Sequence, residues 1–182
     1  MDVRMVPLSS LQPPKWGCTY LLRPDKMLLA SSMRESGWLQ PLVVRLADSM
    51  IIDGTKRWDF ASSDEKFAKR HGPNVPVVYH DVDEIDAMIL HVRLNRARGN
   101  PHPVGLSKIV KQILVSRKYG EVNLANILEL SDEEFELLRT GGLLKSKNWQ
   151  PYTYSRAWVP IEVPSSTKED KPVMERPPNP DR

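Results

Sequence analysis

The sequence predicts an α+β fold, in which a small mixed-sheet domain is followed by a short helical region and a proline-rich tail. Three observations lead to this prediction. Strand-like and helix-like stretches alternate over residues 1–102, helical patterns alone occupy residues 103–144, and seven prolines gather in residues 145–182. Because few crossovers connect the strands, we expect a small sheet in the first region rather than a doubly wound one.

The chain is expected to begin with a short strand over residues 5–11, followed by a loop over residues 12–17, where prolines interrupt regular structure. The next helix is predicted over residues 26–36. Asp25 can serve as its N-cap, because a short acceptor side chain satisfies an unpaired amide, and Gly37 stands where a C-terminal cap belongs.

A hairpin is predicted next. The β-branched stretches of residues 41–46 and 50–53 flank the turn Ala-Asp-Ser, so the two strands are expected to pair. A helix is expected to follow Gly54 and to run to about Ser62 or beyond.

A polar loop over residues 69–74 and a buried strand over residues 75–80 are expected after this helix. The helix predicted over residues 81–95 has Asp83 as its N-cap. Its apolar residues recur at i, i+3, i+4 and i+7, which places them on one helical face: Ile85, Met88, Ile89 and Val92.

The second region is predicted to be all helical. Residues 106–120 carry apolar side chains on one face, residues 124–128 form a short helix, and residues 131–140 begin with a capping box in which Glu134 answers Ser131. The last two segments have helix-turn-helix spacing. However, the second of them begins with consecutive acidic residues, which repel a phosphate backbone, so we expect a structural or partner-binding unit there.

The composition argues against a disulfide-stabilised protein and against a membrane-spanning protein. The chain has 182 residues, a net charge of +3 and one cysteine, Cys18, so it can form no internal disulfide. No apolar run approaches the roughly 20 residues of a membrane span, and the first residues lack the pattern of a signal peptide. We therefore expect a cytoplasmic protein that does not interact with a membrane.

Basic residues gather in one block of the chain. No aspartate or glutamate occurs from Ala87 to Gly120. Such a block is either a solvated helix face or a surface that contacts nucleic acid phosphates. The candidate nucleic-acid contacts are Arg93, Arg96, Lys108 and Lys111.

The candidate phosphate-binding and catalytic residues gather where the Ile51-Ile52 strand meets the following helix. Glycine at position 54 lets a phosphate approach the backbone, and the first helical amides, Lys56 and Arg57 supply positive charge. Asp53 is a candidate ligand for Mg²⁺ or a base that orients a nucleophile. The alternative is that Asp53 only caps the helix and that Lys56 is solvated.

Three segments occur in a characteristic order: ESGWLQPLVVR, IIDGTKRWDFA and VPVVYHDVDEIDAMILHVRLNRARG. Together they resemble the ParB/sulfiredoxin superfamily, specifically the ParB-like N-terminal domain, over roughly residues 4 to 100. The matching features are a helix that ends at Gly37, the dipeptide Gln40-Pro41, the box at residues 54–57, and Asn95 followed by Arg98.

This resemblance implies that the box and the Asn/Arg segment flank the phosphate chain of a nucleotide, usually with a magnesium ion. The implied phosphate-binding residues are Gly54, Thr55, Lys56, Arg57, Asn95 and Arg98, with Asp53 and Arg57 as catalytic candidates. Sulfiredoxin has a cysteine at the position of Thr55, so redox activity is not expected. DNA-segregation clamps have glutamates at the positions of Thr55 and Leu94.

Three functions are therefore considered. The first is binding of a nucleotide triphosphate or of a nucleic acid phosphate, with magnesium-dependent hydrolysis as an NTPase or nuclease acting on DNA. The second is a small-molecule or nucleotide kinase of the same superfamily, in which Asp53 activates a substrate hydroxyl. The third is a DNA-binding adaptor without turnover. The aromatic, proline-rich tail is expected to pack on its own domain, on a second subunit of a homodimer or on a protein partner.

Overall fold

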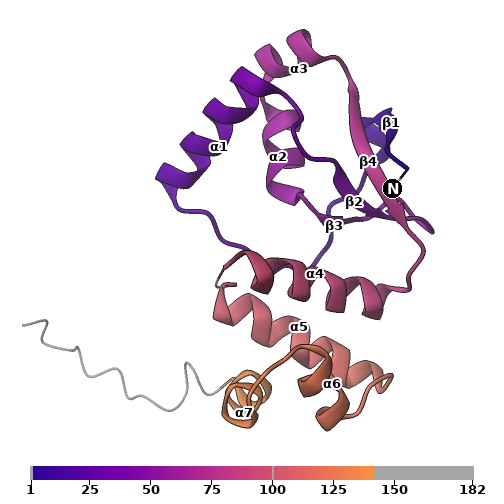
Figure 1. The fold of residues 1–182 in the computed structure, drawn as a ribbon, viewed down its shortest axis with the longest axis vertical. Helices are drawn as coiled ribbons and strands as arrows, with labels where there is room; N and C mark the ends of the chain where they lie inside the picture. Colours follow the sequence, from indigo (N-terminus) through magenta and orange to yellow (C-terminus); the bar gives the residue numbers. More distant parts are fainter. Residues whose placement is uncertain (1, 100, 142–182) are drawn as a thin grey trace, which may run out of the picture. The chain divides into compact units, whose positions relative to one another are not determined.

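The computed structural model describes residues 2–99 and 101–141, all of which fall within one compact unit, Met1–Lys147. These residues form an α+β fold with a four-stranded mixed sheet, as predicted (Figure 1). The predicted tail over residues 145–182 lies outside the described residues. None of the helices in the described ranges is long and apolar enough to cross a membrane.

The sheet has the strand order β1-β4-β2-β3. Its strands are β1 (Arg4–Pro7), β2 (Leu42–Arg45), β3 (Ile51–Asp53) and β4 (Asn74–His80). The predicted hairpin is confirmed, because β2 and β3 pair antiparallel, with an irregular register between Val43 and Val44. Strand β4 is parallel to β2 and antiparallel to β1. Strand β3 therefore lies at one edge of the sheet.

The helical elements are η1 (Leu8–Ser10), α1 (Arg23–Ser36), α2 (Thr55–Ser63), α3 (Glu65–His71), α4 (Glu84–Arg98), α5 (Pro103–Ser116), α6 (Glu121–Ile127) and α7 (Asp132–Thr140). Two predicted N-caps are confirmed. The Asp83 side chain accepts a hydrogen bond from the amide of Asp86, and the Ser131 side chain accepts one from the amide of Glu134.

Helix α3 was not predicted, since its last turn lies in the segment that was expected to be a polar loop. The Asp64 side chain caps α3 by accepting from the amide of Phe67, and Gly72 ends the helix with a φ of 78°. The Phe67 side chain is buried beside Met33 and Ala61. One apolar side chain and two caps thus stabilise a helix whose other residues are mostly polar.

Two helix termini also differ from the prediction. Helix α1 begins at Arg23 rather than after Asp25, with Pro24 in its first turn, where the fixed φ of proline suits a helix. Helix α5 ends at Ser116, before Gly120, because Arg117 adopts a left-handed conformation with a φ of 56°. Gly37 ends α1 as predicted.

Helix α4 joins the sheet to the later helices. Figure 1 shows it between the sheet and α5. Its buried residues, among them Ala87 and Val92, share one hydrophobic cluster with Ile52 of β3 and with Ile109 of α5. A second cluster covers the β2 and β4 side chains, including Leu42 and Val77. The C-terminal end of α4 is thereby held next to the end of β3.

Candidate functional site

The strand-to-helix joint after β3 has the geometry that its sequence predicts. Gly54 is the N-cap of α2 and has a φ of 95°, in the left-handed region. A Cβ atom at this position would lie 2.4 Å from Cδ2 of Leu42 and 2.9 Å from a guanidinium nitrogen of Arg57. Both the backbone conformation and the available space therefore require glycine.

Two guanidinium groups converge on the carboxylate of Asp53. Arg98 Nη1 donates to both Asp53 oxygens at 2.7 Å, and Arg57 Nη2 lies 3.4 Å from Asp53 Oδ2. The Asp53 side chain is 6% exposed, whereas that of Arg98 is 52% exposed. The two arginines come from α2 and α4, so the packing of α4 against β3 brings them to one point.

Arg57 is held from a second side as well. Its Nη1 donates to the backbone oxygens of Gln40 at 2.6 Å and Pro41 at 3.3 Å. Burial lowers the pKa of the Arg57 guanidinium, Asp53 opposes this shift, and Arg98 adds to it. Arg57 therefore links the start of β2 to α2 in a fixed orientation, whereas Arg98 has one side open to solvent.

Asn95 links α4 to the loop before α1. Its Nδ2 donates to the backbone oxygen of His91 at 2.8 Å, and its Oδ1 accepts from the hydroxyl of Thr19 at 3.0 Å. Both ends of the amide are therefore engaged. A phosphate group that binds Asn95 has to share or replace one of these hydrogen bonds.

His91 is a buried histidine that supports the same site. Its Nε2 accepts from the amide of Cys18 at 3.2 Å, so Nδ1 carries the proton that is donated to the backbone oxygen of Ile52 at 2.7 Å. Burial lowers the pKa of His91, with Ile52 and Asp53 opposing this shift. The neutral imidazole therefore connects β3, α4 and the loop at Cys18.

These groups line a pocket of about 660 Å³. The pocket wall includes every predicted phosphate-binding and catalytic residue: Asp53, Gly54, Thr55, Lys56, Arg57, Asn95 and Arg98. Thr55 and Lys56 belong to the first turn of α2, where helix amides lack intrahelical acceptors and the helix dipole is positive. The structure thus brings together in one cavity residues from two distant segments of the sequence.

Another part of this pocket wall was not identified from the sequence. It is formed by the loop before α1 and includes Trp16, Thr19 and Tyr20, with Gln40 nearby. The loop was predicted only as irregular, proline-interrupted chain. No local sequence signal places it over α4, since that position depends on long-range contacts such as the hydrogen bond from Cys18 to His91.

The pocket residues alone do not complete a magnesium site, since this ion usually takes one or two carboxylates together with substrate phosphates and water. No group of three or more His, Cys, Asp and Glu side chains that could hold a metal occurs among residues 2–99 and 101–141. Asp53 supplies the carboxylate in the pocket wall, and both of its oxygens already accept from Arg98. The expectation that Asp53 binds Mg²⁺ therefore gains no support from its surroundings.

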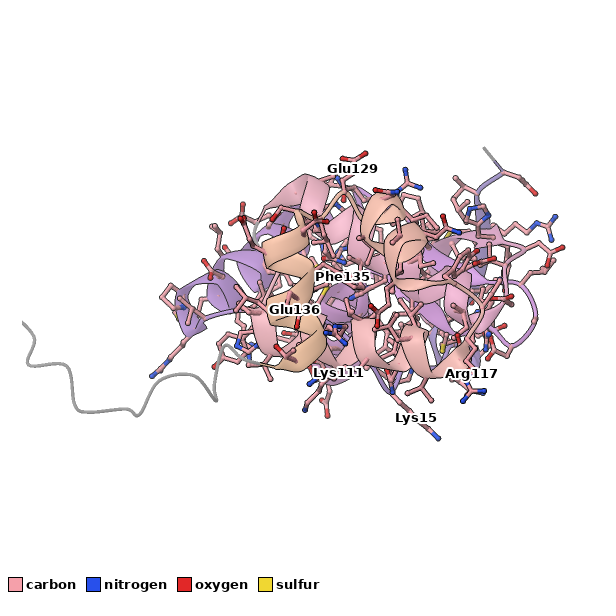
Figure 2. The ribbon with its side chains drawn as sticks, turned by 90° about the horizontal axis from the view of Figure 1, so that it is seen from below. Lys15, Lys111, Arg117, Glu129, Phe135 and Glu136 are labelled. Atoms are coloured by element: carbon pink, nitrogen blue, oxygen red, sulfur yellow. The ribbon has the colours of Figure 1, made fainter. Side chains whose placement is uncertain are left out.

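The candidate nucleic-acid contacts lie outside the 660 Å³ pocket. Arg93, Lys108 and Lys111 are exposed, whereas Arg96 pairs with Glu134 at 2.6 Å. Figure 2 shows Lys111 together with Lys15 and Arg117 on the edge of the molecule opposite Glu129. Three of the four predicted cations are thus accessible, and Arg96 is engaged between α4 and α7.

Comparisons with known proteins agree with this architecture. No family model matches the chain. Uncharacterized protein YbdM of Escherichia coli (strain K12) is 28% identical over 155 residues, which cover 83% of this chain and 73% of that protein. The Pnob8-like ParB-N domain aligns with a TM-score of 0.57 at 18% identity, over 84% of this chain and 75% of that chain. The described residues therefore have the fold of the ParB N-terminal domain, as the motifs predicted.

A ParB protein from Caulobacter crescentus, complexed with CTP-gamma-S, aligns with a TM-score of 0.43 at 22% identity, over 80% of this chain and 89% of that chain. The same protein complexed to the centromeric parS site gives a TM-score of 0.47 at 20% identity, over 74% of this chain and 69% of that chain. At these scores, the superpositions transfer no ligand position to the present pocket.

Proposed function

We propose that the 660 Å³ pocket binds the phosphate groups of a nucleotide or of a nucleic acid. The observation that carries this proposal is the convergence of Arg57 and Arg98 on one point beside the N-terminus of α2. Two guanidinium groups and a helix N-terminus form a strongly anion-attracting arrangement. The glycine at position 54 allows the left-handed turn and the close approach of Arg57 that together build this arrangement.

Arg98 is the residue that changes partner in this proposal. Its side chain is half exposed, so it can turn from Asp53 towards a phosphate in the pocket without unfolding its surroundings. Arg57 remains fixed by the Gln40 carbonyl and balances the Asp53 charge. Asp53 then acts as a positioning residue, which aligns both arginines before the ligand arrives.

Phosphate binding is the part of the proposal that the contacts in the pocket support directly. A hydrolase or a kinase needs a base that can take a proton from water or from a substrate hydroxyl. Asp53 is the expected base, and it can take this role only after Arg98 has turned away from it towards the phosphate. We therefore assign the chain a phosphate-binding role. Release of phosphate from a bound nucleotide would be an additional activity.

A thermal-shift screen tests the proposal. The ligands are CTP, ATP, GTP, ADP and short DNA, each with and without Mg²⁺, and the proteins are the full chain, Arg98→Ala and the control Arg4→Ala. Arg4 is an exposed arginine of β1 that lies outside the pocket and outside the basic block of the chain. At a ligand concentration of about 100 Kd, the stabilisation is about 2.7 kcal/mol, or roughly 5–10 °C in Tm for a chain of this size.

We expect at least one ligand to raise Tm for the wild type and Arg4→Ala, and to lose most of this effect in Arg98→Ala. An equal shift in all three proteins would place the ligand elsewhere. Phosphate release, measured on the same samples, separates binding from hydrolysis.

A further inference from the structure

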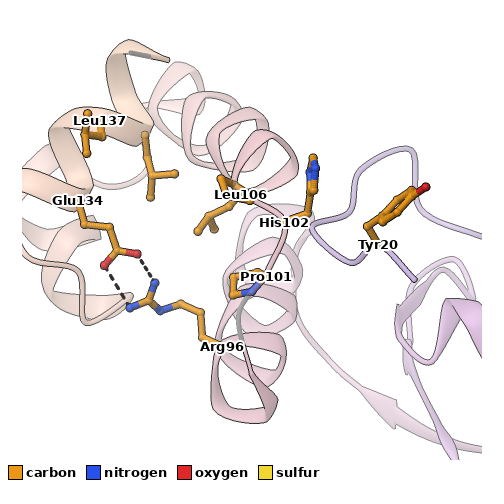
Figure 3. A pocket seen from close by; sticks show the side chains of 9 residues that line it. Tyr20, Arg96, Pro101, His102, Leu106, Glu134 and Leu137 are labelled. Atoms are coloured by element: carbon orange, nitrogen blue, oxygen red, sulfur yellow. Dashed lines mark hydrogen bonds and ion pairs between the residues drawn. The ribbon is translucent and has the colours of Figure 1, made fainter. Parts of the chain in front are cut away.

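A second pocket of about 550 Å³ adjoins the phosphate pocket. It lies between the end of α4, the start of α5 and one face of α7, and it shares Tyr20 and Pro101 with the first pocket as wall residues. Figure 3 shows its lining, with Glu134 and Leu137 on one side and Pro101 and His102 on the other. The two pockets therefore adjoin at Tyr20 and Pro101, and we call the pair of pockets the groove.

The walls of the two pockets differ in chemistry. The second pocket is largely apolar, with Leu106, Leu137 and Leu138 in its lining. Its charged residues are Arg96 and Glu134, which neutralise each other at 2.6 Å. A phosphate gains little from such a wall, whereas a planar base with an apolar face and polar edges fits it.

Aromatic side chains stand at the junction of the two pockets. Tyr20 is 67% exposed, and its ring centroid lies 5.9 Å from that of His102 at an interplanar angle of 43°. Exposed aromatic rings beside a cationic groove are the usual stacking platforms for the bases of single-stranded nucleic acids. Tyr20 thus lies where the chain of a ligand would pass from one pocket to the other.

From these observations we infer that the groove binds single-stranded nucleic acid, with one phosphate in the first pocket and an adjoining base in the second. The inference rests on the proposed phosphate binding and names its ligand class. Each pocket alone has the volume of a small-molecule site, about 300–1,000 Å³.

The test compares a fluorescently labelled, 5′-phosphorylated trinucleotide with a nucleoside monophosphate of the same base. The variant is Leu137→Glu, which places a negative charge on the rim of the second pocket, where Leu137 is 43% exposed. The matched control is Val115→Glu, which makes the same charge change at an 82% exposed residue of α5 outside both pockets. Anisotropy and competition give the Kd values, and Tm confirms folding.

We expect the trinucleotide to bind the wild type at least about tenfold more tightly than the monophosphate, since one stacked base contributes roughly this factor. Leu137→Glu should remove most of this gain, whereas Val115→Glu should keep it. Monophosphate binding should be equal in all three proteins.

Equal affinity for both ligands in the wild type, or a gain that survives Leu137→Glu, would overturn the inference and leave phosphate binding intact. If neither ligand binds, the proposed function fails together with it.

Discussion

Arg98 Nη1 lies 2.7 Å from both carboxylate oxygens of Asp53, a residue 45 positions earlier in the chain. This contact fixes the end of α4 against the end of β3. Because Arg57 approaches the same carboxylate from α2, Asp53 occupies the point at which an anionic ligand would meet two guanidinium groups. The carboxylate and a phosphate therefore compete for Arg98.

This competition predicts the behaviour of Asp53→Asn. A neutral amide binds Arg98 less strongly, so the affinity for a phosphate ligand should rise. The folded state should lose about 1–3 kcal/mol, because the partly buried Arg57 keeps a weaker acceptor. Isothermal titration with the best nucleotide of the screen and urea unfolding measure the two effects.

Asp59→Asn is the control for this experiment, since it makes the same charge change at an exposed position of α2. If Asp53 were a magnesium ligand or the base of a hydrolase, Asp53→Asn would instead weaken nucleotide binding in the presence of Mg²⁺ or abolish phosphate release. Either result would contradict the positioning role.

The local half of this site could be predicted from the sequence. Gly54 between a β-branched strand and a cationic helix start predicts the joint, because the backbone requirement is local. The meeting of Arg98 with Asp53 could be expected only from the resemblance to a known domain, since it depends on the packing of α4 on β3. The loop with Trp16 and Tyr20 was missed, because its place is set by contacts with residues far along the chain, such as His91.

Gly54→Ala should destabilise the fold more than Gly141→Ala does. Both glycines lie in the left-handed region, with φ of 95° and 69°, so alanine costs about 1–2 kcal/mol at either position. At Gly54 the new Cβ would also lie 2.4 Å from the packed side chain of Leu42, whereas at Gly141 it would meet the end of the flexible Lys111 side chain. The clash with Leu42 should add about 1–3 kcal/mol.

Urea unfolding of the two variants and the wild type measures the difference. If both substitutions lowered the free energy of unfolding equally, Leu42 would move aside without cost. The packing around Gly54 would then not exclude a side chain at this position.

Stability should fall in mild acid because of His91. Burial lowers the pKa of His91 in the folded state below its ordinary value of 6.5. Below pH 6.5 the unfolded chain therefore binds a proton that the folded chain does not, and the free energy of unfolding decreases as the pH falls. The slope from this residue is at most about 1.4 kcal/mol per pH unit.

Urea unfolding at pH 7, 6 and 5 tests this expectation. His91→Gln should be less stable at pH 7, because the hydrogen bonds with Cys18 and Ile52 are disturbed, but its stability should depend less on pH. The exposed His80 provides the control, and His80→Gln should keep the wild-type slope. If the free energy of unfolding of His91→Gln changed with pH as it does in the wild type, groups other than His91 would be responsible for the acid sensitivity.

The stretch from Ala87 to Gly120, which contains no aspartate or glutamate, leads to a separate prediction about DNA binding. If its exposed cations contact phosphates, the double variant Lys108→Ala/Lys111→Ala should reduce the slope of log K against log salt by about 1 for each lost contact. Arg96→Ala should change this slope little, because Arg96 is paired with Glu134 and also donates to the backbone oxygen of Glu129. Anisotropy titrations of a duplex at several salt concentrations give the slopes.

Comparing the double variant with Arg96→Ala distinguishes the effect of exposed cations from that of a cation already paired with Glu134. Arg96→Ala removes one positive charge but also frees Glu134, so any effect on DNA should be a small, long-range repulsion that is screened at about 0.15 M salt. A loss in Arg96→Ala as large as that in the double variant would mean that DNA displaces Glu134 and binds across α4 and α7. An unchanged slope in the double variant would show that the block is a solvated helix face, so that any nucleic acid binding would have to arise in the groove beside Arg98.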